Sequence, residues 1–503
     1  MLAIGSLRNR KVGDFMRIGI IGAGPAGITA AYQLSKAGAQ VEVFEAGENV
    51  GGLSRTIDLW GQKVDLGPHR FFSQDHRVND VWLDVVGSDY RMIDRLTRIY
   101  YQSRFFHYPL KPANALWNMG LPKAIHCLAS YLKERIRPSF SADQNETFES
   151  WVVGRFGRQL FEMFFKSYSE KLWGIPCDQL DADFAAQRIK KFSLGEAIKA
   201  ALGLGKGQHK TLVDQFAYPT GGTGMVYERM AERIAENGGG VHLHSAVRRI
   251  NHHDHHVDGL EMVDGRIEPF DHVISTMPLT LLVRGLGDLP PEVEQGVDQL
   301  RFRNTVLVYL NVDSTELFKD QWLYVHSPEL GTGRVTNFRN WVPDLYGDAM
   351  TSILALEYWC YDEDPLWRES DEKLIERASQ EIRTTGLIGS ANILAGHVHR
   401  IRRCYPVYSA GYKKHLQPVI DHVKQFDNLQ VIGRYGSFKY NNQDHSILMG
   451  VLAAENVLER RQHDLWAVNT DSEYQEAATI DKSGLQQHPE SPVTAPVAES
   501  VEV

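Results

Sequence analysis

The segment RIGIIGAGPAGITAAYQLSKAGAQVEVFE, residues 17–45, decides the fold. A strand pattern leads into Gly22, Gly24 and Gly27, an alanine-rich helical pattern follows, and a second strand pattern ends at Glu45. Glycines at this spacing permit a tight turn and close approach of the backbone to a pyrophosphate, while the acid can hold a ribose hydroxyl. The segment predicts a βαβ unit that binds a dinucleotide; the alternative is a strand-turn-helix whose glycines serve packing only.

A second glycine pair indicates which dinucleotide the chain binds. Gly51 and Gly52 follow the βαβ unit and continue into Leu53 and Arg55, where the backbone can approach the cofactor again. This pattern resembles the FAD-binding fold of the glutathione-reductase type, in which the corresponding segment runs beside the flavin pyrophosphate. We therefore expect FAD rather than NAD.

Size and composition limit the class of protein. With 503 residues, 43% of them apolar, the chain is long enough for two or three subdomains. Its apolar runs have the length of strands, and the one after the basic N-terminal residues is the cofactor strand itself, so we expect no membrane span and no cleaved secretory signal. Four widely spaced cysteines fit neither a metal site nor a disulfide framework and predict a reducing, cytoplasmic location.

The charge balance constrains the partner. A formal net charge of −9 argues against nucleic acid and would repel an anionic small molecule at long range. An acidic substrate would therefore need a locally basic pocket, which directs attention to individual arginines.

The order of patterns predicts an α/β protein with interleaved domains. We expect a Rossmann-like FAD-binding domain, an inserted mainly helical subdomain and an antiparallel-sheet substrate subdomain. The FAD-binding domain is assigned to residues 16–75, 216–285 and 420–460, the helical subdomain to 76–215, and the sheet-based subdomain to 286–419. Residues 1–15 are an N-terminal extension, and residues 464–503 are predicted to be a disordered tail because they lack apolar periodicity.

Three runs carry a more specific resemblance: FESWVV (148–153), YSEKLWGIP (168–176) and GRYGSFKYNNQDHS (433–446). Over roughly residues 16–460 the chain resembles the FAD-dependent UDP-galactopyranose mutases, the eukaryotic type most of all, within the superfamily of the amine oxidases. The resemblance implies an isomerase that interconverts the pyranose and furanose forms of a sugar nucleotide. In that family N5 of reduced flavin attacks the anomeric carbon, UDP leaves, and the flavin-bound sugar opens and recloses. NAD(P)H is a possible reductant, and polysaccharide biosynthesis the expected setting.

The resemblance also assigns residues to roles. The candidate cofactor-binding residues are Gly22, Gly24, Gly27, Glu45, Gly51, Gly52, Leu53, Arg55, Gly67, Val247, Gly433, Arg434, Gln443 and Ser446. The candidate substrate-binding residues are Tyr108, Arg188, Trp322, Tyr324, Arg334, Tyr405, Tyr440 and Asn442, and the candidate catalytic groups are His69, Arg188 and Arg334. A guanidinium fork matches phosphate oxygens bidentately, so the two arginines suit a diphosphate. The alternative is that each arginine pairs with a core carboxylate or covers a helix face.

Several positions keep a second interpretation. His69 is expected beside the flavin ring, yet a lone histidine can be structural, and Trp322 and Trp173 can wall the sugar site or belong to the core. Lys111 stands where the family has a glutamine near Tyr108, which leaves uracil selectivity open. The connection from Tyr440 to Asn442 is two residues shorter than in the eukaryotic-type mutases, so the loop that presents Asn442 can be rearranged.

Competing functions remain open. An oxidase or desaturase resembling amine or protoporphyrinogen oxidases would keep the fold and make the arginines structural, and a non-catalytic glycan-binding scaffold is a third reading. The cluster His252–His256 is read as a solvated hairpin rather than a metal site, and no metal is assigned. A sugar nucleotide is the expected partner, and the apolar surface of residues 115–170 could support a homo-oligomer.

Overall fold

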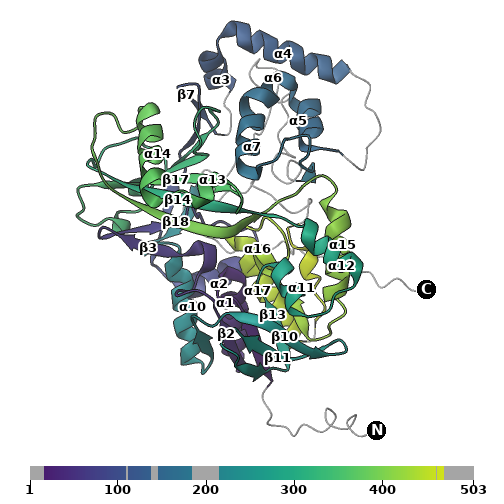
Figure 1. Ribbon diagram of the computed structural model, residues 1–503. Helices are drawn as coiled ribbons and strands as arrows, with labels where there is room; N and C mark the ends of the chain where they lie inside the picture. Colours follow the sequence, from purple (N-terminus) through teal and green to yellow (C-terminus); the bar gives the residue numbers. More distant parts are fainter. Residues whose placement is uncertain (1–15, 109–111, 137–145, 184–214, 460, 470–503) are drawn as a thin grey trace, which may run out of the picture.

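The computed structural model describes residues 16–108, 112–136, 146–183, 215–459 and 461–469. Figure 1 shows three stacked regions: a domain built on a parallel sheet, which corresponds to the predicted nucleotide-binding domain, a large sheet above it, and a group of helices, α3 to α7, at the far end. Within the described residues, no helix combines the length and the apolar composition needed to cross a bilayer.

A five-stranded parallel sheet forms the nucleotide-binding domain. Its order is β19-β13-β1-β2-β9, and every neighbouring pair is parallel. The strands are β1 (Arg17–Ile21), β2 (Gln40–Phe44), β9 (Gly240–His242), β13 (His272–Ser275) and β19 (Leu429–Val431). Because side chains alternate along a strand, Ile18 and Ile20 face one layer and Ile21 faces the other. All five strands fall in the three segments assigned above to the FAD-binding domain.

Two different layers cover this sheet. On one face lie α1 (Pro25–Lys36), α2 (His76–Val86), α10 (Gly224–Glu236) and α17 (Gln443–Leu458), whose apolar sides share a core with Ile18, Ile20 and Val43. On the other face lies a small antiparallel sheet of β10 (Val247–His253), β11 (His256–Met262) and β12 (Ile267–Pro269). This arrangement leaves the carboxyl ends of the parallel strands pointing at the second large sheet (Figure 1).

The second sheet has seven strands in the order β18-β14-β17-β16-β15-β6-β7. They are β6 (Thr97–Tyr101), β7 (Arg104–His107), β14 (Phe302–Val312), β15 (Trp322–Val325), β16 (Arg334–Asn337), β17 (Ser352–Cys360) and β18 (Ile393–Pro406). All pairs are antiparallel except β15 with β6. One face packs on α14 (Asp371–Thr384), and the other contributes Leu307, Tyr309 and Trp322 to a core nearer the cofactor.

Shorter elements complete the structure. The remaining strands are β3 (Thr56–Leu59), β4 (Gln62–Asp65), β5 (Tyr90–Asp94) and β8 (Gln215–Pro219). The remaining helices are α3 (Pro112–Met119), α4 (Leu121–Ile136), α5 (Phe148–Phe156), α6 (Arg158–Phe161), α7 (Ser167–Trp173), α11 (Leu279–Gly285), α12 (Pro291–Gln299), α13 (Pro365–Arg368), α15 (Tyr412–Val423) and α16 (Gly433–Gly436). Short turns are η1 (Gly52–Ser54), the π-helical η2 (Glu162–Lys166), η3 (Phe338–Asn340), η4 (Pro343–Leu345) and η5 (Leu465–Ala467).

Two expectations need correction. The stretch 76–215, expected to be mainly helical, also contains β5, β6 and β7, and β6 extends the large sheet by pairing Arg98 with Leu323. The prediction of a disordered tail from residue 464 is wrong for its first residues, because η5 forms at Leu465–Ala467 and Leu465 and Val468 are buried. Two apolar side chains are enough to fix this short turn against the cofactor domain, while residues 470–503 lie outside the described part of the chain, as do residues 1–15.

Candidate active site

A cavity of about 750 Å³ lies between the two sheets. It begins at the carboxyl ends of the parallel strands, the position at which doubly wound sheets bind ligands, and continues under the large sheet. Its lining includes Gly22 and Glu45 at one end and Trp322, Tyr324 and Arg334 at the other. Segments far apart in the sequence thus enclose one continuous space.

The glycine-rich turn is shaped by close backbone contacts. Gly22 has φ +95°, and a Cβ there would lie 2.2 Å from Oγ1 of Thr276. A Cβ on Gly52 would lie 3.0 Å from Cα of Gly24, so the two glycine motifs touch each other at the cavity. Only glycine permits both this φ and this approach, which explains the spacing in the sequence.

Glu45 organises the same turn. Its carboxylate accepts hydrogen bonds from the backbone N–H groups of Ala23 and Gly47, both at 2.8 Å. Because each carboxylate oxygen has a further lone pair, Glu45 can still accept a ribose hydroxyl from the cavity side. Its binding of a ribose remains a prediction.

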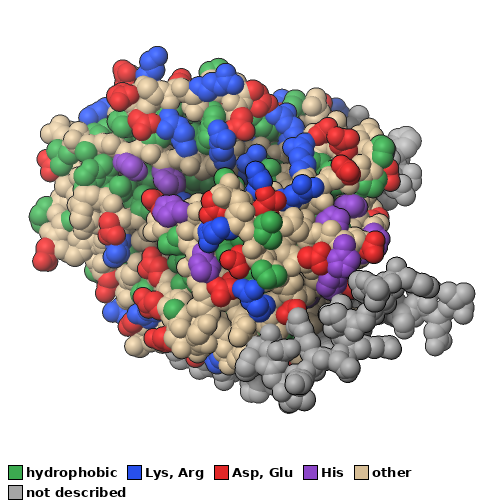
Figure 2. All heavy atoms as spheres, turned by 60° about the horizontal axis from the view of Figure 1, so that its bottom comes forward, with side chains coloured by type: hydrophobic (Ala, Val, Ile, Leu, Met, Phe, Trp, Pro, Cys, Tyr) green, Lys and Arg blue, Asp and Glu red, His purple; other side chains and the backbone are tan. Residues whose placement is uncertain are grey.

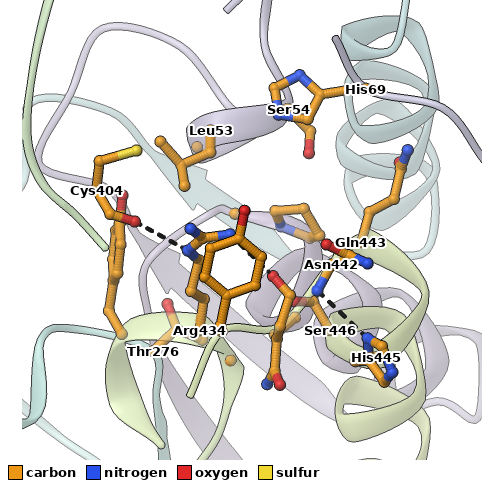
Figure 3. A pocket seen from close by; sticks show the side chains of 18 of the residues that line it. Leu53, Ser54, His69, Thr276, Cys404, Arg434, Asn442, Gln443, His445 and Ser446 are labelled. Atoms are coloured by element: carbon orange, nitrogen blue, oxygen red, sulfur yellow. Dashed lines mark hydrogen bonds between the residues drawn. The ribbon is translucent and has the colours of Figure 1, made fainter. Parts of the chain in front are cut away.

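Arg434 is the cation at the centre of the cavity (Figure 3). Its guanidinium lies 4.5 Å from the ring centroid of Tyr405 and 4.2 Å from that of Tyr440, while Nε donates to the carbonyl of Cys404 and Nη1 to that of Asn441. Nη2 is buried and has no hydrogen-bond partner among the described residues. Arg434 itself lines the cavity, and a cation in a cavity wall fits an anionic or electron-rich ligand. Together with the glycine cradle, this residue fits a bound FAD.

Arg334 has a carboxylate partner in the cavity wall. Its Nε donates to Oε1 of Glu357 at 2.6 Å and Nη2 donates to Oε2, so the pair is bidentate. Nη2 also lies 3.4 Å from the hydroxyl of Tyr405. Glu357 is 2% exposed, and both side chains line the cavity. Both interpretations from the sequence therefore apply: Arg334 pairs with a buried carboxylate, and it also faces the site.

Tyrosines form the wall around this pair. Tyr405 and Tyr440 stack with ring centroids 5.3 Å apart, and Tyr324 contacts Tyr168 and Tyr108 edge to face at 5.5 and 5.2 Å. Trp173 is fully buried behind Tyr405 and Tyr440 and supports the wall without lining the cavity. The surface offered to a ligand is thus rich in phenol groups.

His69 is a neutral histidine. Burial, together with the positive charges of Arg334 and Arg434, lowers its pKa to about 3. The residue lines the cavity (Figure 3), and its backbone carbonyl accepts from Oγ1 of Thr223 at 3.1 Å. It can therefore present a ring nitrogen or a backbone group, but no charge, to a ligand at neutral pH.

Most of the residues expected at the site do line the cavity: Gly22, Gly24, Glu45, Gly52, Leu53, Gly67, His69, Val247, Trp322, Tyr324, Arg334, Tyr405, Gly433, Arg434, Tyr440, Asn442, Gln443 and Ser446. Gly27, Gly51, Arg55 and Tyr108 lie just outside it. A Cβ on Gly27 would lie 2.1 Å from the carbonyl oxygen of Gly22, so its role is to let α1 pack on the turn. Arg188 and Lys111 lie outside the described residues.

The comparison with known proteins follows this geometry. The family model for flavin-containing amine oxidoreductases matches residues 25–458. The chain belongs to this family. The expected flavoprotein superfamily is therefore confirmed, and its cofactor is FAD.

Relatives and solved structures differ in their activities. Coproporphyrinogen III oxidase of Mycobacterium tuberculosis is 23% identical over 390 residues, which is 73% of this chain and 81% of that protein. A probable UDP-galactopyranose mutase of Klebsiella pneumoniae is 24% identical over 190 residues, 35% of this chain and 45% of that protein. A crystal structure of reduced UDP-galactopyranose mutase has a TM-score of 0.76 at 22% identity, covering 89% of this chain and 96% of its own. A putative protoporphyrinogen oxidase from Exiguobacterium has a TM-score of 0.68 at 20% identity, covering 89% and 100%.

Some residues of this flavoprotein site were missed in the sequence. Glu357 is the single acid in the apolar strand SILALEYWC. A lone acid in an apolar strand is the sequence feature by which this site residue could have been found. Thr276 directly follows β13, so it occupies the same sheet edge as Gly22. His445 lies within the run 433–446 and was not singled out there, whereas Cys404 carries no comparable signal, because only the tertiary fold brings it to the cavity.

The shortened connection before α17 has a definite conformation. Asn442 is the N-cap of α17 and lines the cavity, and its backbone N–H donates to Nδ1 of His445 at 3.3 Å (Figure 3). Asn441 is turned inward, is 2% exposed, and bonds to Ser437 and Asn469. The loop thus keeps Asn442 beside Gln443 and Ser446 at the helix N-terminus.

The histidine cluster forms a surface hairpin. His253 pairs with His256 at the turn between β10 and β11, and their side chains bond to Asp258 and Asp427 respectively. Among the described residues, no group of three or more His, Cys, Asp or Glu side chains is arranged to hold a metal ion. Basic and acidic side chains are interspersed over the face seen in Figure 2.

Proposed function

We propose that this flavoprotein is a sugar-nucleotide mutase that interconverts the pyranose and furanose forms of a UDP-galactose-type substrate. The observation that carries the proposal is the composition of the cavity wall: Arg334 and the phenols of Tyr324, Tyr405 and Tyr440 line the same space as the cofactor residues. When bound and reduced, FAD would supply a nucleophilic nitrogen to such a site.

The wall suits a diphosphate. Arg334 offers donors on a rigid guanidinium, and tyrosine hydroxyls offer further donors that cost little entropy to fix because their rings already pack together. Donors held in place beforehand bind the diphosphate and stabilise it as a leaving group. A channel for an apolar substrate would instead be lined by aliphatic side chains.

Glu357 sets how Arg334 acts. The bidentate pair fixes the plane of the guanidinium and offsets part of its charge, so Arg334 orients a phosphate without holding it too tightly to release. Arg188 would add a second cation; its place in the site remains a prediction.

The test is a direct assay of ring interconversion. Purified holoenzyme is mixed with UDP-galactofuranose with and without dithionite, and the products are separated by anion-exchange chromatography. We expect conversion to UDP-galactopyranose only after reduction, with a higher KM in Arg334→Lys because a lysine cannot form the fork. No conversion by reduced enzyme would overturn the proposal.

The chain offers a matched control. Arg98 forms a similar bidentate pair with Asp320, at 2.9 and 2.6 Å, in the same sheet but outside this cavity. Arg98→Lys should therefore leave KM unchanged. An equal rise in KM for both variants would assign the effect to the sheet rather than the site.

An oxidase of carboxylate-bearing tetrapyrroles is the second candidate. It is favoured by the pairing of Arg334 with Glu357, as expected for a structural arginine, and by the coproporphyrinogen III oxidase relative, whose match spans more of the chain than that of the probable mutase. Oxygen-dependent appearance of coproporphyrin fluorescence from coproporphyrinogen III, without ring interconversion, would select it.

A further inference from the structure

A buried carboxylate lies beneath the loop that forms one wall of the cofactor cavity. Asp65, the last residue of β4, is completely buried, and no described Lys, Arg or His side chain forms an ion pair with it. The chain then runs through Leu66 and Gly67 to His69, all of which line the cavity. The carboxylate is therefore close in sequence to the cavity wall but does not itself line the cavity.

Hydrogen bonds from three elements hold Asp65. Oδ1 accepts from Oγ1 of Thr56 at 2.6 Å and from the backbone N–H of Thr223 at 3.2 Å. Oδ2 accepts from the hydroxyl of Tyr218 at 2.7 Å and from Oγ1 of Thr223 at 2.8 Å. Neutral donors thus replace the counter-ion that a buried carboxylate usually requires.

Thr223 is shared between this carboxylate and the loop. Its Oγ1 lies 2.8 Å from Oδ2 of Asp65 and 3.1 Å from the backbone oxygen of His69. A hydroxyl has one proton to donate, so Thr223 cannot satisfy both acceptors fully at once. The stronger acceptor, an ionised carboxylate, takes that proton and leaves the His69 carbonyl with the weaker contact.

We propose that Thr223 is a positioning residue for the flavin site: its hydroxyl couples the His69 loop to Asp65, so the hydrogen bond it gives to the His69 carbonyl depends on whether Asp65 is charged. When Asp65 gains a proton, Oδ2 becomes a donor to Oγ1 of Thr223, and the Thr223 proton turns to the carbonyl of His69. No atoms are exchanged except that one proton from solvent. The proposal needs only that FAD occupies the cavity, and it holds for a mutase or an oxidase.

The surroundings of Asp65 suit such a change. Burial raises the pKa of Asp65 to about 6, and the hydrogen bonds from Thr56, Tyr218 and Thr223 oppose that rise only in part. The other titratable groups that face it are Tyr218 on β8, Tyr227 on α10 and Tyr309 on β14, and burial raises the pKa of each, so all three stay neutral. Among these groups, therefore, only Asp65 changes its charge between pH 5 and 7.

Sulfite provides a readout that does not depend on turnover. It adds to N5 of oxidised flavin and bleaches the absorption near 450 nm, so its apparent affinity reports on the wall beside the flavin. The ionisation of sulfite itself changes its affinity with pH in every variant alike, and this common change is subtracted. After that correction, titrations of the holoenzyme with sulfite from pH 5 to 8 should show a further change of about three- to tenfold centred near pH 6, the size expected from one neutral hydrogen bond. Asp65→Asn keeps the shape without the charge and should abolish this change.

Variants at Thr223 distinguish a hydroxyl that couples Asp65 to the His69 loop from one that only supports the structure. Thr223→Val removes the hydroxyl and should abolish the pH dependence, while Thr223→Ser keeps it. Thr220→Val is the matched control, because Thr220 lies in the same turn but its hydroxyl bonds to the carbonyl of Asp89. A wild-type profile in Asp65→Asn or in Thr223→Val would overturn the proposal, and if Thr223→Val loses flavin, Asp65→Asn alone decides. Mutase or oxidase assays play no part in this outcome.

Discussion

Arg334 and Glu357 place a charge pair, rather than a lone cation, in the wall of the cavity. Burying both charges is costly, and the bidentate geometry offsets that cost only while both partners are present. The pair therefore serves orientation more than net stability. Arg434 also lines the cavity, but among the described residues no carboxylate forms an ion pair with it, and its Nη2 is buried without a hydrogen-bond partner.

Removing one partner of the pair should destabilise the protein strongly. Arg334→Leu leaves the Glu357 carboxylate buried without compensation, so we expect the free energy of unfolding to fall by about 3–5 kcal/mol. The double variant Arg334→Leu with Glu357→Leu should recover most of this loss. Urea denaturation followed by tryptophan fluorescence measures both; equal losses in the single and double variants would contradict the prediction.

The sequence predicted which residues lie at the site better than it predicted which residues they pair with. The sequence indicates Arg334, Tyr405 and Tyr440 because each lies in a recognisable run, but the partner Glu357 is 23 residues away on a neighbouring strand and has no motif of its own. Similarly, Glu45 was expected to meet a ribose, whereas its bonds to Ala23 and Gly47 depend on the turn geometry. Such pairings are set by register and packing, which a single sequence does not contain.

At the scale of elements, the hairpin of β15 and β16 positions part of the cavity wall. Tyr324 is the next-to-last residue of β15 and Arg334 begins β16, and the loop between the two strands is held from two sides. Nζ of Lys171, on α7, donates to the carbonyls of Val325, Ser327 and Thr332 at 3.0, 2.7 and 3.3 Å. Lys171 is thus one of the links between the helical region and the sheet, together with Arg303, whose guanidinium donates to the carbonyls of Lys171 and Leu172.

Loss of this lysine should loosen the loop. In Lys171→Met the three carbonyls lose their donor, so we expect faster hydrogen exchange at residues 326–333 and an increase of severalfold in KM for a ligand that Tyr324 and Arg334 bind. Lys166→Met, at an exposed position one turn earlier, is the matched control. Unchanged exchange in Lys171→Met would show that the bonds of Glu381 to Gly331 and Thr332 suffice.

The elements themselves were predictable where a local pattern dominates. The βαβ unit follows directly from its glycines and apolar periodicity, and β14 and β17 follow from their nearly continuous apolar runs. The position of β6 and β7 in the large sheet did not follow, because β6 pairs with β15 across more than 200 residues and both strands are short. The turn at Leu465 was missed because only two apolar residues mark it.

At the scale of the whole molecule, buried neutral histidines should make the protein sensitive to acid. Burial lowers the pKa of His69 and His326 to about 3 and that of His272 and His399 to about 4. Below pH 6.5 the unfolded chain takes up protons that the folded chain does not, so the free energy of unfolding falls as pH drops towards 4. Asp65, with its raised pKa, acts in the opposite direction below pH 6.

The four histidines outweigh Asp65, so the free energy of unfolding falls as the pH falls. We expect the thermal unfolding midpoint to fall continuously from pH 7 to pH 5, and His326→Phe to flatten the curve because it removes one of these sites while preserving the stacking on Tyr168. His244→Asn, at an exposed position, should leave the curve as in the wild type. A midpoint independent of pH over this range would contradict the assignment.

The order of strands in the parallel sheet also constrains synthesis of the chain. β1 lies between β2 and β13, and β13 in turn needs β19, so the first strand made has no complete sheet until its last strand has emerged. Arg17 meets Asp271 across 254 residues. The glycine turn that binds the cofactor therefore waits, during translation, for most of the polypeptide. Flavin capture is expected as a late, post-translational event, and premature termination before residue 429 should yield a chain that cannot retain its cofactor.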